Sequence, residues 1–358
     1  MRIIDLHARW PQQYAADLAG PESELARRIG PRLSQLAGYL SGTAAAFLVC
    51  GPGVGNWPAD ADCWRRLGET IRLVEAEFSG RLLLGPGDVQ RWRAEPKPPL
   101  CWGMLAVEGL GQVLGGEADL DRIHRLFQRG VRAFALAGWE TNGAGFWAAN
   151  SSKIVLSDLG QRCLATLVEL GPPAGEVGPC PLLDLAGLDQ EAISAVLDWV
   201  EADPSRAGRL IVFRSRGGWD PIESDSERPV RCLPAWMERV WRLGGVIGLT
   251  PGAAGLETPA QALQAILDVG PRSFQGRPGW ECIGIGTSFP EVERPAPGLE
   301  TVGRIAGWLQ SALEPAAARA VAWGNARRLI ERAAGVFNDD VQSERKGTQL
   351  QGEGERTP

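Results

Sequence analysis

The stretch LAVEGLGQVLGGEADLDRIHRLFQRGVRAFAL, residues 105–136, decides the fold. It begins as an apolar strand that ends on Glu108, passes through a glycine-rich turn into a helix over Leu120–Phe127, and closes as a second apolar strand over Gly130–Leu136. Strand, helix and strand in this order make a βαβ unit, the building block of a parallel sheet. Such folds carry their chemistry at the carboxyl ends of the strands. Glu108 is therefore the first candidate for a functional side chain.

The same alternation recurs along the whole chain. The predicted strands are residues 2–6, 44–50, 105–107, 131–136, 181–185, 209–213, 245–249 and 282–286. The predicted helices are residues 23–40, 62–78, 120–127, 157–170, 188–201, 233–243, 259–269, 301–313 and 315–334. Eight apolar strands with helices between them predict an α/β fold of the closed (β/α)8 TIM-type, as in metal-dependent hydrolases. An open doubly wound sheet is the alternative.

Smaller features complete this outline. Asp88 and Ser157 are each expected to cap a helix, and residues 138–153 are expected to form a long loop at the functional end of the barrel. We expect residues 1–337 to form a single barrel domain. Residues 338–358 are polar, with almost no large apolar side chain, and are expected to be disordered.

Composition narrows the classes of partner. The net charge of −6 is mild, and no basic stripe is present, so neither nucleic acid nor an anionic membrane is an expected partner. The chain shows no secretory signal and no uncharged apolar run of membrane-spanning length, so a cytoplasmic location is expected. The seven cysteines form no Cys-x-x-Cys pair, which favours free thiols.

The strand ends, taken together, resemble the membrane (renal) dipeptidase family from Asp5 to about Leu329. The resemblance depends on the order and spacing of several short motifs. They are Asp5-Leu6-His7, Val107-Glu108-Gly109, Gly130-Val131-Arg132 with Leu136 and Asn142, Leu183-Asp184-Leu185, Arg231-Cys232-Leu233-Pro234, Ile283-Gly284-Ile285-Gly286 and Gly324-Asn325.

The resemblance implies a barrel metallopeptidase that hydrolyses dipeptides with two zinc ions. In that family a bridging glutamate, a His-x-Asp pair and two further histidines hold the metals, so that a shared water becomes hydroxide. Glu108 falls at the bridging position, and His7 falls at the first histidine. Arg231 corresponds to the arginine that binds the substrate carboxylate.

The remaining positions of the metal site and catalytic site have changed. The replacements are Arg9 for the aspartate of the His-x-Asp pair, Gly138 for the substrate-contacting histidine after strand four, Gly187 for the histidine after strand five, Arg214 or Ser215 for the histidine after strand six, and Ser288 for the catalytic aspartate. The strand-six position is ambiguous by one residue.

Two aligned ligands cannot hold two zinc ions, because a zinc site needs three or four protein ligands. We therefore expect no cofactor, or zinc only if the family chemistry is retained through His7 and Glu108. Burial of an unpaired carboxylate would be costly, so Glu108 is expected to pair with Arg9 or Arg214. The only other histidine, His124, lies on a helix away from the strand ends. Ser288 would be a nucleophile only if His7 were its base.

Aromatic and basic side chains gather near the same strand ends. The aromatic residues are Trp10, Trp57, Trp139, Phe146 and Trp147. They form either a hydrophobic lid or an aromatic wall for a ligand. The residues expected to bind a ligand are Arg9, Trp139, Asn142 and Arg231. This combination suits a small zwitterionic or anionic ligand.

Three hypotheses follow. The first, which we favour, is a catalytically degenerate dipeptidase-like barrel, a pseudoenzyme or small-ligand binder. The second is a hydrolase of the metallopeptidase class that cleaves dipeptides with zero or one metal ion and Glu108 as the base. The third is a scaffold protein that assembles as a homodimer.

Overall fold

The computed structural model describes residues 1–11, 39, 42–51, 61–95, 101–137, 145–150, 153–173, 175–217, 235–253, 256–274, 277–289 and 295–336. Eight parallel strands form one sheet in the order β8-β7-β4-β3-β2-β1-β12-β9. Their bounds are β1 Ile3–Ala8, β2 Thr43–Cys50, β3 Trp102–Val107, β4 Val131–Ala135, β7 Leu182–Asp184, β8 Ile211–Phe213, β9 Ile247–Leu249 and β12 Ile283–Ile285.

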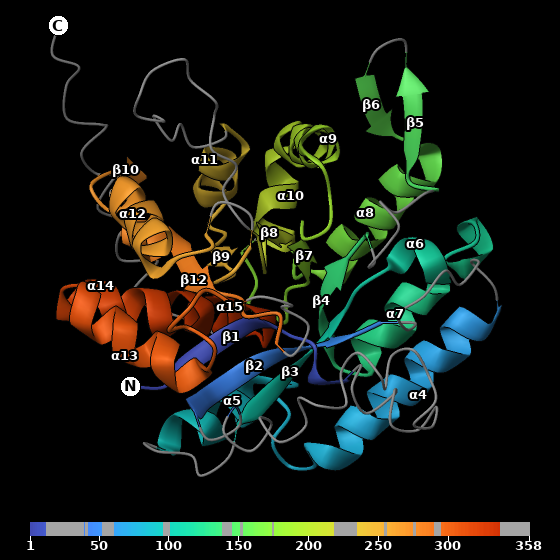
Figure 1. Cartoon of the computed structure of the whole chain (residues 1–358). Coiled ribbons are helices and arrows are strands. Elements are labelled where there is room, and N and C mark those ends of the chain that lie inside the picture. Colours follow the sequence, from blue (N-terminus) through green and yellow to red (C-terminus); the bar gives the residue numbers. More distant parts are fainter. Residues whose placement is uncertain are drawn as a thin grey trace, which may run out of the picture.

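The two ends of this sheet meet. The Arg214 backbone N–H donates to the Val246 carbonyl at 3.0 Å, and the Gly248 N–H donates to the Arg214 carbonyl at 2.7 Å. These bonds join the end of β8 to β9, so the sheet closes into a barrel with helices around it (Figure 1). The predicted (β/α)8 barrel is confirmed, and the open doubly wound sheet is wrong.

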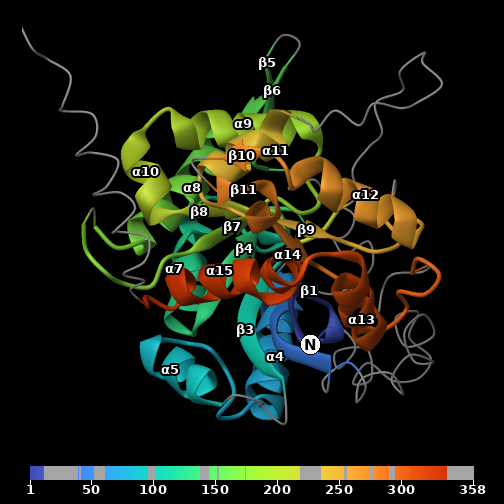
Figure 2. The same cartoon turned by 90° about the vertical axis from the view of Figure 1, so that its left-hand side faces the viewer.

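Helices alternate with the strands. They are α4 Ala61–Glu77, α5 Pro86–Ala94, α6 Leu110–Val113, α7 Asp121–Gln128, α8 Asp158–Leu170, α9 Gln190–Glu201, α10 Pro204–Arg209, α11 Ala235–Arg242, α12 Pro259–Val269, α13 Val302–Ala312, α14 Pro315–Arg319 and α15 Asn325–Ala333. Figure 2 shows α13, α14 and α15 following one another past β1. Short 3-10 turns lie at Glu117–Asp119 and Gly279–Cys282.

Alternation of side chains along the strands produces two apolar layers. In β2, Ala46, Leu48 and Cys50 join the large cluster under the helices, whereas Ala45, Phe47 and Val49 join a second cluster. Successive side chains of a strand point to opposite faces, so the second cluster is the barrel interior. Both faces of the sheet are buried, which explains why the strands are almost continuously apolar.

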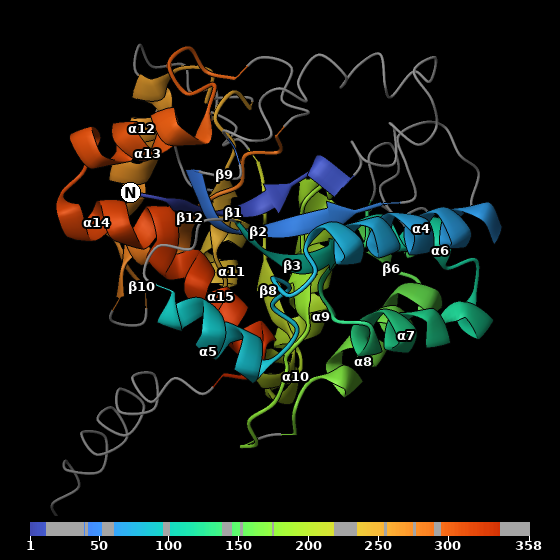
Figure 3. The same ribbon diagram turned by 90° about the horizontal axis from the view of Figure 1, so that it is seen from below.

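The last helix closes the amino-terminal end of the barrel. Its buried residues Ala326, Leu329, Ile330 and Ala333 belong to the interior cluster. Helix α5 lies beside it (Figure 3), and Arg93 of α5 forms an ion pair with Glu331 of α15. The amino-terminal end is therefore sealed, and the polar residues described below lie at the opposite end.

Several local predictions need correction. Asp88 is not a helix N-cap: α5 begins after Gly85, and the Asp88 carboxylate accepts bonds from the Leu84 and Gly85 N–H groups, both at 3.0 Å. Part of the predicted loop 138–153 is instead an antiparallel hairpin of β5 Trp147–Asn150 and β6 Lys153–Leu156. The predicted last helix is interrupted by a π-turn at Ala320–Gly324.

Some of the remaining predictions concern described residues, and others fall outside them. Ser157 caps α8 as predicted, since its hydroxyl accepts a bond from the Gly160 N–H at 3.1 Å. Six cysteines in the described part of the chain are free, as predicted, and all six are buried. In the described part of the chain, none of the helices combines the length and apolarity that crossing a bilayer requires. Most of the predicted helix at residues 23–40, and the tail at 338–358, lie outside the described residues.

Candidate functional site

Arg9 and Glu108 meet at the carboxyl end of the barrel. Arg9 follows β1, and Glu108 follows β3. The Arg9 guanidinium donates through one nitrogen to both oxygens of the Glu108 carboxylate. Arg9 is fully buried and Glu108 is only 5% exposed. The predicted pairing of Glu108 with an arginine is confirmed, and Arg9 is the partner.

His7 lies between this ion pair and Ser215. The Arg9 Nε–H donates to His7 Nε2 at 3.2 Å, and His7 Nδ1 lies 2.7 Å from the Ser215 hydroxyl. A guanidinium can only donate, so Nε2 is the acceptor and the ring proton sits on Nδ1, which donates to Ser215. Burial, and then the positive charges of Arg216 and Arg9, hold the pKa of His7 well below its usual range. His7 is therefore a neutral imidazole with both nitrogens engaged.

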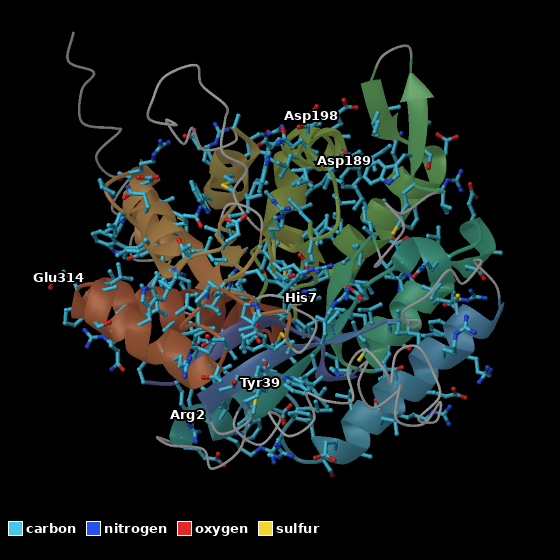
Figure 4. All side chains as sticks on the ribbon, viewed as in Figure 1. Arg2, His7, Tyr39, Asp189, Asp198 and Glu314 are labelled. Atoms are coloured by element: carbon cyan, nitrogen blue, oxygen red, sulfur yellow. The ribbon has the colours of Figure 1, made fainter. Side chains whose placement is uncertain are left out.

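Asp184, at the end of β7, extends this arrangement. Its carboxylate accepts a bond from the Ser215 N–H at 2.8 Å and from the Ala186 N–H at 2.9 Å. Asp184 thus fixes two backbone turns, and burial raises its pKa. We call the series Asp184–Ser215–His7–Arg9–Glu108 the polar chain. It crosses the barrel end from β7 through β8 and β1 to β3, and Figure 4 shows His7 near the middle of the molecule.

Asp5 forms a second buried cluster that ties β1 to β12. One of its oxygens accepts from the His7 N–H and the Thr287 N–H, both at 2.9 Å. The other accepts from the Tyr39 hydroxyl at 2.7 Å and the Thr287 hydroxyl at 2.5 Å. Burial raises the pKa of Asp5, although these hydrogen bonds oppose the rise. The carboxylate fixes the backbone at His7.

Ser288 and Gly187 both have backbone conformations in the left-handed region. Ser288 has a φ of 54°, and its N–H donates to the His7 carbonyl at 2.8 Å. Its hydroxyl is buried and has no hydrogen-bond partner among the described residues. Because both nitrogens of His7 are engaged by Ser215 and Arg9, His7 is not a base for Ser288. Gly187 has a φ of 83°, so a histidine at that position would be strained.

The aromatic residues divide into three groups. Trp10 is a core residue and not part of a ligand wall: it is 2% exposed, and its ring packs on Tyr39 with centroids 5.3 Å apart. Phe146 is fully buried, and Trp147 is half-buried. Five residues of the predicted site or lid lie outside the described residues, namely Trp57, Gly138, Trp139, Asn142 and Arg231.

The sequence had left the strand-six position ambiguous, and the structure places Ser215 in the polar chain. Arg214 lies instead with its guanidinium 4.9 Å from the ring centroid of Trp236. Sequence reasoning overlooked that Ser215 bonds to His7 and that Tyr39 and Thr287 hold Asp5. One signal in the sequence could have placed Ser215 in the site. Successive side chains of an extended segment point to opposite faces, so in Arg214-Ser215-Arg216 after β8 the serine can face inward while its neighbours do not.

The residues present do not fit a pair of zinc ions. Among the residues that the structure describes, no group of three or more histidine, cysteine, aspartate or glutamate side chains could hold a metal. More directly, the two candidate ligands, His7 Nε2 and the Glu108 carboxylate, both accept hydrogen bonds from Arg9. A fixed guanidinium between them repels a dication and uses the electron pairs that would bind it.

The fold and the position of this site define the class: a closed (β/α)8 barrel with polar residues at the carboxyl ends of its strands. No protein-family model and no curated protein matches the chain in sequence. Solved structures do match in fold. The chain has the fold of dipeptidase metallopeptidases, confirming that resemblance at the level of the barrel.

Three of these structures show how far the likeness extends. A metallo peptidase from Rhodobacter sphaeroides, liganded with a phosphinate mimic of L-Ala-D-Ala, has a TM-score of 0.63 at 15% identity, covering 93% of this chain and 99% of that one. A dipeptidase described as a metallo peptidase of family M19 has a TM-score of 0.63 at 16% identity, covering 94% and 99%. The probable dipeptidase PvdM from Pseudomonas aeruginosa has a TM-score of 0.55 at 16% identity, covering 83% and 87%.

Proposed function

We propose that this chain is a metal-free, dipeptidase-like barrel protein that binds a small zwitterionic or anionic ligand without hydrolysing it. One observation carries the proposal. The Arg9 guanidinium lies between His7 and Glu108, where it holds the two side chains that would otherwise be metal ligands. A cofactor is not part of this function.

The competing hypothesis is a hydrolase in which Glu108 is the general base. Such an enzyme needs a carboxylate that can accept a proton from water. Both Glu108 oxygens already accept bonds from Arg9, so the electron pairs that would take a proton from water are engaged in an ion pair. The nearest histidine is engaged as well. These contacts favour binding over catalysis.

Ligand binding is supported by the kind of molecule that structures of this fold hold. The Rhodobacter sphaeroides peptidase was solved with a mimic of a dipeptide, which carries both a carboxylate and an amine. In this chain, the half-buried cation Arg216 follows the barrel strand β8 at the same end, and its charge acts on His7 and Asp184. Guanidinium groups are well suited to recognise a carboxylate.

The test is hydrolysis of a panel of dipeptides by the full-length protein, with and without added zinc, alongside Glu108→Gln. Thermal shift with the same dipeptides reports binding, because a ligand that binds only the native state raises the melting temperature. We expect thermal stabilisation without hydrolysis. Zinc-dependent hydrolysis that Glu108→Gln abolishes would refute the proposal.

A further inference from the structure

We draw no further inference here: the strongest candidate, the side-chain cluster of Arg93, Arg327 and Glu331 where α5 meets α15 at the amino-terminal end of the barrel, carries nothing, because both guanidinium groups are already ion-paired with the buried Glu331 carboxylate and nothing in the described part of the chain shows what else would bind there.

Discussion

At the scale of single residues, Arg9 organises the carboxyl end of the barrel. Its side chain contacts His7 through Nε and Glu108 through a terminal nitrogen, so one guanidinium fixes a histidine and neutralises a carboxylate. Both contacts are buried, where electrostatic interactions are strong and unpaired charges are costly. The residue that engages both candidate metal ligands therefore also supports the fold.

Removing one member of this ion pair should be more harmful than removing both. Arg9→Leu removes the buried cation that neutralises Glu108 and should cost about 3–5 kcal/mol of unfolding free energy. The double variant Arg9→Leu/Glu108→Leu should lose much less than the sum of the two single changes, because no charge is stranded. Urea denaturation of all four proteins completes the cycle. Additive losses would mean that the pair is not coupled.

His7 should make stability depend on pH. Its folded-state pKa lies well below the unfolded value of about 6.5, so the unfolded chain takes up a proton first as the pH falls. Stability is therefore fully present above about pH 6.5 and should decline below it, by up to about 1.4 kcal/mol per pH unit. Raised pKa values at Asp5 and Asp184 act in the opposite direction, since those groups favour the native state when protonated.

Variants of the two histidines isolate this effect. His7→Asn should flatten the decline in melting temperature between pH 6.5 and pH 5, whereas His124→Asn, at the only other histidine of the chain, should leave it unchanged. Asp5 and Asp184 are present in both variants, so their contribution is common to both. An unaltered slope in His7→Asn would show that His7 is not the group that titrates.

At the scale of elements, the side-chain amide of Asn325 connects the last helix, α15, to the strand β12 and the turn before it. Asn325 Nδ2 donates to the Trp280 carbonyl at 2.7 Å and to the Ile283 carbonyl at 2.6 Å. Asn325→Ala removes both hydrogen bonds, one to the turn before β12 and one to β12 itself, and should destabilise the protein by about 1–3 kcal/mol in chemical denaturation. Ser311→Ala, at an exposed position of α13, should stay within about 0.5 kcal/mol of the wild type. Equal stability of the two variants would contradict this role.

Elements were predictable where the apolar pattern was long and regular. Helix α12 begins and ends where its pattern predicts, and the capping hydroxyl of Ser157 begins α8. The hairpin β5–β6 was not predicted, because its short strands follow a segment rich in glycine and asparagine that is typical of a loop. Asp88 was misassigned because an acidic side chain satisfies backbone N–H groups equally well from the third helical position.

The site was only partly predictable for a different reason. The sequence indicated that Glu108 pairs with an arginine, but Arg9 and Arg214 both follow strands that end at the same barrel face. Choosing between them requires the directions of the side chains. The bond between His7 and Ser215 joins residues 208 positions apart, so no local pattern could reveal it.

At the scale of the whole molecule, the barrel architecture and the functional site depend on different sets of residues. Apolar strands packed on both faces maintain the architecture, as the likeness to solved dipeptidases at 15% and 16% identity illustrates. Function depends on a few side chains at the strand ends. Here, among the described residues, those side chains form a connected series of hydrogen bonds that joins the ends of β7, β8, β1 and β3.

The zinc content of the full-length protein tests this account most directly. Wild-type protein and Arg9→Asp are each incubated with excess zinc, desalted and measured by elemental analysis. The wild type should hold well under one zinc per chain, because Arg9 engages His7 and Glu108. Arg9→Asp should bind about one, because it frees these two side chains and adds a third ligand. One or two zinc ions per wild-type chain, lost on mutation of Glu108 to glutamine, would contradict the account.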